Sequence, residues 1–215
     1  DQILNKINKN KKNNQISFMG ESGYLMGKNY VRRYQIIKTL LKNFDLNLFI
    51  FEKKNRNITE ILMLYLKSYI KILINKFPLK KTKFSIYNNI KISDYLLTKQ
   101  SIKTLFPKNV IEPLFGLNYY NFLNEILIFV NCHRLDVPSG NMKLFEVSGV
   151  GTAQITDYND ETNNLFKEND EILFYKTNDE LVSKLKEIQK KPKFIKNIGK
   201  QAQKKILKYH TTKHR

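Results

Sequence analysis

The chain has 215 residues, of which 41% are hydrophobic, enough to build a buried core in one large or two small domains. It contains no apolar run of about 18 residues, which excludes a membrane-spanning helix. Its single cysteine, Cys132, excludes an internal disulfide framework and fits a reducing compartment.

The formal net charge of +19 suggests two anionic partners, nucleic acid and a membrane surface. Only five of the 38 basic residues are arginine, the residue that best forks onto phosphates and bases, and no nucleic-acid-binding motif accompanies them. We therefore expect no nucleic-acid partner. Residues 1–120 hold 22 basic and 7 acidic side chains. This half can rest against an anionic membrane, although a solvated basic face is the favoured interpretation.

The first part of the chain predicts a βαβ unit. Residues 15–20 form an apolar run closed by glycine, typical of a buried strand that leads into a loop. Residues 30–44 carry apolar side chains at helical spacing, and residues 46–51 form a second apolar run. A strand, a helix and a strand in this order indicate parallel pairing.

The regions on either side of this unit are harder to interpret. Residues 1–14 are polar and rich in lysine and asparagine, so we expect a linker or the end of a preceding segment. The chain lacks an initiating methionine, and we expect a fragment of a longer protein. Residues 57–77 predict a strongly apolar helix, for which packing in the core is favoured over membrane anchoring. Residues 79–108 support no firm prediction.

The second half alternates between predicted strands and helices. The expected strands are a short one ending in the segment NVIEPLFG and runs at 126–131, 152–156 and 171–175; the expected helices are 117–125, about 142–148, about 160–167, 178–189 and 192–209. The last helix places Phe194, Ile198, Ala202 and Ile206 on one stripe. This alternation predicts a doubly wound parallel sheet within one domain, residues 15–215.

Ligands of open parallel sheets bind beyond the carboxyl ends of the strands, and two loops there are weak candidates. The first, MGESGYLMGK, contains Gly20 but lacks the spacing of a dinucleotide fingerprint or a P-loop, so a plain turn is the favoured interpretation. The second contains His133 and Arg134. There a cation can meet a phosphate and an imidazole can donate a hydrogen bond, with a structural histidine as an equal alternative.

A third segment offers a helix start suited to a diphosphate. Ser139 or Asn141 can cap a helix that begins near Met142. The free backbone N–H groups and the helix dipole then point to the space in front of Gly140.

The body of the same helix offers a sugar-binding carboxylate. Glu146 lies one turn after Lys143 and shares its face. A carboxylate in this place can accept hydrogen bonds from both hydroxyls of a ribose. Gly149 and Gly151 then end the helix and let the backbone approach closely. The alternative is a solvated glutamate on a surface helix.

The run of motifs in the second half resembles a known enzyme family. It comprises NCHR with a following aspartate, GNMKLFE, two glycines, TD, the strand EILFY and a final segment with glycine, HT and arginine. Over residues 116–215 this run resembles the C-terminal half of bacterial GT-B glycosyltransferases, in the group-1, spore-maturation-like branch. The segment from 16 to 40 is similar more loosely. The resemblance implies a Rossmann-like three-layer α/β domain with a central parallel sheet that binds a nucleotide sugar.

The resemblance also implies roles for individual residues. Glu146 matches the glutamate at the ribose or sugar of the donor, preceded by Asn141 and Lys143; arginine is commoner at the lysine position. Many relatives carry two glutamates separated by seven residues, and the earlier position here is Pro138. With the loop candidates, the expected donor-binding residues are Gly20, His133, Arg134, Gly140, Asn141, Lys143, Glu146 and Gly149.

The expected function is transfer of a sugar from a nucleoside diphosphate sugar to a hydroxyl acceptor, in cell-surface polysaccharide or lipid-linked glycan synthesis. Lys143, Arg134 and Arg33 are candidates to stabilise the departing diphosphate. No catalytic residue is assigned, and no metal or cofactor is expected because no Asp-x-Asp motif occurs. The acceptor is expected on an N-terminal domain outside this sequence. The expected compartment is the cytoplasm, with contact to the inner membrane face as an open alternative. The rival class is a nonenzymatic basic protein that binds nucleic acid or an anionic membrane.

Overall fold

A computed structural model of the chain describes residues 6–7, 15–24, 28–46, 48–52, 59, 62–63, 66, 69–70, 100–133, 141–211 and 214. Of the expected linker, only Lys6 and Ile7 are described, and Ile7 packs partly buried against a core cluster. The division into a linker and one domain stays a prediction.

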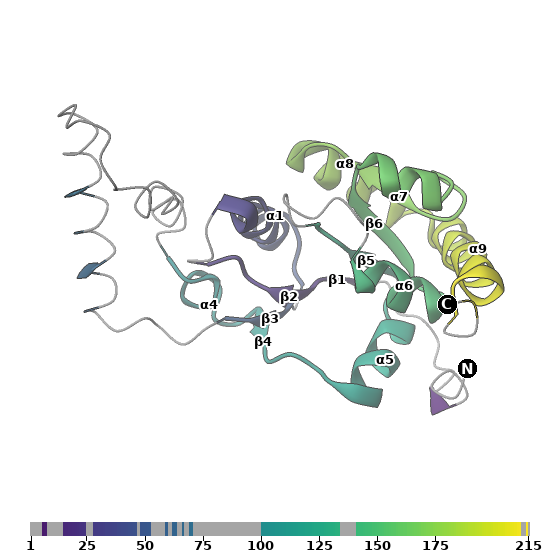
Figure 1. The fold of residues 1–215 in the computed structure, drawn as a ribbon, viewed down its shortest axis with the longest axis horizontal. Coiled ribbons are helices and arrows are strands. Elements are labelled where there is room, and N and C mark those ends of the chain that lie inside the picture. Colours follow the sequence, from purple (N-terminus) through teal and green to yellow (C-terminus); the bar gives the residue numbers. More distant parts are fainter. Residues whose placement is uncertain are drawn as a thin grey trace, which may run out of the picture.

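Parallel strands form the centre of the described fold (Figure 1). They are β1 (Ile16–Ser17), β2 (Met19–Glu21), β3 (Leu48–Phe51), β4 (Val110–Ile111), β5 (Ile128–Val130), β6 (Ala153–Asp157) and β7 (Leu173–Tyr175). They pair in two sheets, in the orders β1-β5-β6-β7 and β2-β3-β4, with every pair parallel. The runs predicted at 15–20, 46–51, 126–131, 152–156 and 171–175 all contain strand, which confirms the prediction of a parallel α/β fold.

The two sheets are joined through the first strand segment. Only Phe18 separates β1 from β2; Ile16 of β1 pairs with β5, and Met19 of β2 pairs with β3. Phe18 itself accepts a backbone hydrogen bond from Phe49 at 3.1 Å. The strand order across both sheets is therefore β4-β3-β2/β1-β5-β6-β7. The chain adds strands first on one side of the β1/β2 segment and then on the other, so the order of addition, not the strand direction, reverses there. In doubly wound folds, ligands bind at the carboxyl ends of the strands at this reversal.

Helices cover both faces of the strands and give three layers. They are α1 (Lys28–Asn43), α4 (Ile102–Leu105), α5 (Gly116–Glu125), α6 (Met142–Gly149), α7 (Asp160–Leu165), α8 (Asn178–Ile188) and α9 (Pro192–Tyr209). The side chains of β5 alternate between two core clusters. Ile128 shares a cluster with side chains of α1, α4 and α8, whereas Phe129 shares one with side chains of α5 and α6.

Local sequence signals set several helix starts. The Asn159 side chain accepts a hydrogen bond from Thr162 N at 2.7 Å at the start of α7, and the Thr177 side chain caps α8. Pro192 begins α9, where its missing N–H costs no intrahelical hydrogen bond.

Helix α9 has the predicted bounds, and Ile198, Ala202 and Ile206 of the predicted stripe are buried, but Phe194 is not. Phe194 is 40% exposed, whereas Ile195 is fully buried together with Ile198. The predicted stripe stepped by four residues each time and therefore drifted around the helix, which turns every 3.6 residues. The buried side chains Ile195, Ile198, Ala202 and Ile206 are separated by steps of three, four and four, so the inclusion of Phe194 was wrong.

The prediction of a core-packing helix at 57–77 is wrong for the residues that are described there. The chain is helical at these positions, but five apolar side chains are 40–68% exposed: Leu62, Met63, Leu66, Tyr69 and Ile70. None of them belongs to a core cluster of the described residues. In the described part of the chain, no helix is long and apolar enough to cross a bilayer.

Candidate functional site

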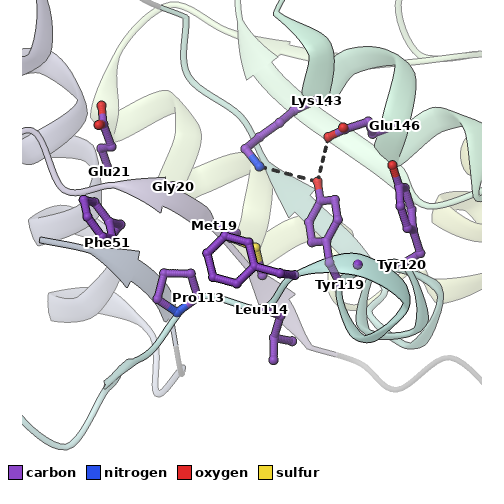
Figure 2. Close-up of a pocket in the computed structure, with 12 residues that line it drawn as sticks. Met19, Gly20, Glu21, Phe51, Pro113, Leu114, Tyr119, Tyr120, Lys143 and Glu146 are labelled. Carbon is purple, nitrogen blue, oxygen red and sulfur yellow. Dashed lines mark hydrogen bonds between the residues drawn. The ribbon is translucent and has the colours of Figure 1, made fainter.

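A cavity of about 600 Å³ lies beside the carboxyl ends of β2 and β3, between these strands and helices α5 and α6 (Figure 2). Its lining is mostly apolar with a few polar groups, as in many ligand-binding cavities. Of the predicted site residues, the cavity brings together Gly20, Lys143 and Glu146. The other lining residues are Met19, Glu21, Phe51, Pro113, Leu114, Phe115, Gly116, Tyr119 and Tyr120.

Gly20 belongs at this wall for a conformational reason. Its φ is +153°, a backbone conformation that L side chains rarely adopt. Glycine therefore permits this path of β2 along the cavity. The sequence favoured a plain turn at Gly20, whereas the structure places it in a strand.

A chain of hydrogen bonds forms the polar end of the cavity. The Tyr119 hydroxyl lies 3.1 Å from Glu146 Oε2 and 3.4 Å from Lys143 Nζ (Figure 2). Burial, and then the charge of Glu146, raises the pKa of Tyr119, so the phenol keeps its proton. An ammonium group can only donate, so the single phenol proton points to the carboxylate. The chain therefore runs from Lys143 through Tyr119 to Glu146.

Lys143 places a cation in the cavity that forms no ion pair with the described residues. Burial lowers the pKa of its ammonium group; the Glu146 charge opposes this shift and the Arg33 charge adds to it. The ammonium lies 4.9 Å from the centre of the Tyr119 ring. Among the described residues, no carboxylate lies within ion-pair distance of it. The fold therefore keeps a partly desolvated positive charge available to an anion.

Arg33 places a second cation at the carboxyl end of β5, outside the lining of the cavity. It extends from α1, and its Nη2 donates a hydrogen bond to the Cys132 carbonyl oxygen, at the end of β5, at 3.0 Å. Its Nε is buried without a hydrogen-bond partner among the described residues. Because the Arg33 charge lowers the pKa of Lys143, the two cations share one region of positive potential.

Asn141 fixes the start of α6 and decides between the two predicted caps. Its Oδ1 accepts a hydrogen bond from Leu144 N at 3.3 Å, while Ser139 lies outside the described residues. Asn141 and Asn131 also exchange a pair of side-chain hydrogen bonds of 3.0 and 3.2 Å, which we call the amide clasp. The clasp ties the start of α6 to the end of β5, so the first N–H groups of α6 lie at the carboxyl end of β5.

His133 occupies a buried network rather than the cavity wall. It is 5% exposed; its Nδ1 lies 2.7 Å from Asp157 Oδ1, and its backbone N–H donates to the same oxygen at 2.9 Å. Asp157 also pairs with Arg32 at 3.3 Å. Burial raises the Asp157 pKa, but hydrogen bonds and charge from His133, with help from Arg32, lower it overall. An ionised carboxylate only accepts, so the hydrogen-bond network assigns a proton to His133 Nδ1.

The remaining predicted residues also lie apart from the cavity. Gly149 faces α9, where its carbonyl oxygen accepts a hydrogen bond from Gln203 at 2.9 Å and its Cα side meets Ile206. Arg134 and Gly140 lie outside the described residues. Donor contacts by His133, Arg134, Gly140 and Gly149 stay predictions, and none of them enters the function proposed below.

Sequence reasoning missed the aromatic side of the site. Tyr119 and Tyr120 were read only as part of a helix, although both line the cavity. The available signal was a pair of tyrosines that follows a short strand and the proline and glycine of the segment EPLFG. Loops that follow strands in parallel sheets commonly bind ligands. Adjacent residues of a helix normally face different directions, so helical spacing does not predict that both tyrosines line one wall.

Comparison with solved structures supports the fold. A sucrose-phosphate synthase from Thermosynechococcus elongatus matches with a TM-score of 0.50 and 11% identity, over 96% of this chain and 43% of that chain. A protein from Listeria monocytogenes described as a UDP-N-acetylglucosamine 2-epimerase matches with a TM-score of 0.41 and 12% identity, over 96% of this chain and 46% of that one. This chain thus spans less than half the length of these structures.

The fold is the expected one, an α/β domain with parallel sheets between helices, similar to domains of GT-B glycosyltransferases. No curated protein matches the sequence. A family model described as glycosyl transferase-like matches residues 78–215, more than half of the chain and all of the segment that supplies α5, α6, Tyr119, Lys143 and Glu146. The chain belongs to this glycosyl transferase-like family.

Proposed function

We propose that the chain is the donor-binding domain of a glycosyltransferase that moves a sugar from a nucleoside diphosphate sugar to a hydroxyl acceptor. The observation that carries the proposal is the arrangement of Lys143 and Arg33. Lys143 lines the cavity with Glu146 and has no ion-pair partner among the described residues. Arg33 comes from another helix to the end of β5, where its charge acts on Lys143. Membership of the glycosyl transferase-like family supports the same function.

The donor fits this arrangement in three parts. Its diphosphate lies near Arg33, Lys143 and the start of α6, where cations and free N–H groups meet. Its ribose hydroxyls donate to Glu146. Its base packs against the apolar lining, which includes Met19, Leu114 and Phe115.

Catalysis in this proposal is stabilisation of the leaving group. The bond between the anomeric carbon and the donor phosphate oxygen breaks, and the acceptor hydroxyl oxygen forms a new bond to that carbon while its proton passes to solvent. The electron pair of the broken bond stays on the nucleoside diphosphate. Arg33 and Lys143 meet the charge that develops there, which lowers the barrier because these groups are already in place. The acceptor glycan, the pathway, contact with the inner membrane face and the spore-maturation-like branch stay proposals.

A matched pair of lysine variants separates this proposal from its rival, a basic protein that uses its overall charge. Lys143→Met and Lys200→Met remove the same charge, but Lys200 is exposed on α9. We expect uridine, guanosine, adenosine and cytidine diphosphates, titrated calorimetrically, to include at least one that binds the wild type. Lys143→Met should weaken that binding at least about 10-fold, a loss of about 1.4 kcal/mol, and Lys200→Met should leave it unchanged.

The same variants test the rival directly. Binding of heparin or single-stranded DNA that is tight, falls steeply with salt and weakens equally in both variants would favour an electrostatic binder. Absence of binding by every nucleoside diphosphate would overturn the donor-binding proposal.

A further inference from the structure

We propose that Tyr119 is a positioning residue that makes the site selective for ribonucleoside diphosphates over their 2′-deoxy counterparts. This inference rests on the proposed function, because it assigns Glu146 to the ribose. It adds a residue that touches neither the phosphate nor the sugar and acts through Glu146.

The ring of Tyr119 is held firmly by the fold. It is 8% exposed and belongs to the core cluster that contains Leu123, Phe129 and Val147. These neighbours come from α5, β5 and α6, so the ring is fixed by three elements at once. Only its hydroxyl reaches the polar end of the cavity (Figure 2). The position of that hydroxyl is therefore set by core packing.

This fixed hydroxyl orients the carboxylate of Glu146. The Tyr119 proton occupies Oε2 at 3.1 Å, and Oε1 has no hydrogen-bond partner among the described residues. A glutamate that is half-buried at the wall of a cavity would otherwise turn about its last torsion, which is broad. With Oε2 anchored, the remaining lone pairs keep one direction, which suits a pair of adjacent hydroxyl donors.

Tyr119 also keeps the cation and the carboxylate apart. Its hydroxyl lies between Lys143 Nζ and Glu146, accepting from the first and donating to the second. Without the hydroxyl, the ammonium and the carboxylate can pair directly, which would neutralise both groups. With the Tyr119 hydroxyl in place, these hydrogen bonds leave Glu146 as an acceptor at one end and Lys143 as a donor at the other. A ribose diol followed by a phosphate is the complement of this order.

Selectivity follows from the count of donors. A carboxylate only accepts hydrogen bonds, so loss of the 2′-hydroxyl removes one charge-assisted bond from an oriented acceptor. We expect the wild type to bind a 2′-deoxynucleoside diphosphate at least about 10-fold more weakly than the ribonucleotide. A carboxylate that turns freely or pairs with Lys143 gains less binding free energy from a hydrogen bond with the 2′-hydroxyl. Tyr119→Phe should therefore reduce the ratio of the 2′-deoxy to the ribonucleotide dissociation constant to below about 3-fold.

The experiment compares dissociation constants for each ribonucleoside diphosphate that binds and for its 2′-deoxy counterpart, in the wild type, Tyr119→Phe, Glu146→Gln and Tyr120→Phe. Tyr120 is the matched control because it lines the same cavity and packs against Tyr119 in a tilted contact with ring centres 5.1 Å apart. Among the described contacts it makes no hydrogen bond to Glu146. Tyr120→Phe should keep the wild-type ratio. Glu146→Gln should lower the ratio as Tyr119→Phe does.

Melting temperatures supply a readout that needs no ligand. The shifts caused by Tyr119→Phe and Glu146→Gln should sum to more than the shift of the double variant, because the two single changes remove one shared hydrogen bond. Additive shifts, or an unchanged ratio in Tyr119→Phe, would overturn the role of Tyr119 while donor binding stands. Coupled melting shifts with no nucleotide bound by the wild type would overturn the proposed function, and this inference with it.

Discussion

The polar residues at the carboxyl ends of the strands are of two kinds. Some satisfy each other's hydrogen bonds within the fold, and others keep hydrogen-bonding groups available to a ligand. His133 and Asp157 satisfy each other in a buried network, and Arg32 completes it. Lys143 and Glu146 instead keep unused hydrogen-bonding capacity toward a cavity. The sequence left a donor contact and a structural role open for His133; its hydrogen bonds to Asp157 join the ends of β5 and β6, and the donor contact stays a prediction.

Asp157 predicts a specific dependence of stability on pH. Its pKa is lowered in the folded state, so its contribution is present above the ordinary carboxyl pKa of about 3.9 and is lost as pH falls through the lower folded value. Asp157→Asn should reduce the free energy of unfolding by roughly 2–4 kcal/mol at neutral pH, because the buried hydrogen bonds of His133 lose their charged acceptor and Arg32 loses its ion-pair partner. Urea unfolding should show this difference shrinking below about pH 4.

An exposed aspartate serves as the control for this experiment. Asp170 lies 3.9 Å from Lys167, and both side chains are largely exposed. Asp170→Asn should change the unfolding free energy by no more than about 0.5 kcal/mol at any pH in the series. A difference between wild type and Asp157→Asn that stays constant from neutral to acid pH would contradict the ionic role of Asp157.

At the scale of elements, helix α9 packs directly on the chain between helix α6, which carries site residues, and strand β6. A Cβ placed on Gly199 would collide with the Gly151 carbonyl oxygen and the Ala153 amide nitrogen, both backbone atoms. The helix can therefore touch the chain between α6 and β6 directly only because residue 199 is glycine. The sequence predicted the bounds of α9 well, because its caps and composition are local signals. It could not predict this contact, which depends on how three distant segments meet.

Two glycine-to-alanine changes should have opposite effects on stability. Gly199→Ala should destabilise the fold by roughly 1–3 kcal/mol, because the helix must shift away from backbone that cannot yield. Gly149→Ala adds a Cβ that meets Ile206 at an ordinary 3.8 Å, so it should be neutral or stabilise by up to about 1 kcal/mol. Thermal melts of both variants check the signs. Weaker nucleotide binding by Gly149→Ala would support the predicted donor contact of Gly149.

At the scale of the whole molecule, the alternation of strands and helices was predictable and the composition of the site was only partly so. Buried parallel strands are continuous apolar runs, which is why the runs at 126–131 and 171–175 identified β5 and β7. Glu146 and Lys143 were found because one helix carries both. Tyr119 was missed because its partners lie on another helix, and the direction of its hydroxyl is decided by tertiary packing.

The net charge of +19 is a property of the whole molecule that a nucleotide should barely sense. Charges beyond a Debye length of about 8–10 Å are screened at physiological salt. If Arg33 and Lys143 are the two cations that meet the diphosphate, the logarithm of affinity should fall against the logarithm of salt concentration with a slope of about 1–2. Lys143→Met should lower this slope by about 1, and Lys200→Met should not. A slope above about 5, shared by all variants, would point to the overall charge instead.

The amide clasp between Asn131 and Asn141 has a consequence for changes in the length of the chain between them. The two asparagines close the ends of the intervening segment on each other, so the placement of α6 is decoupled from the length of that segment. Closing a longer loop costs little, about 0.6 kcal/mol for each doubling of its length. Insertions or deletions between the two asparagines should therefore leave the start of α6 in place.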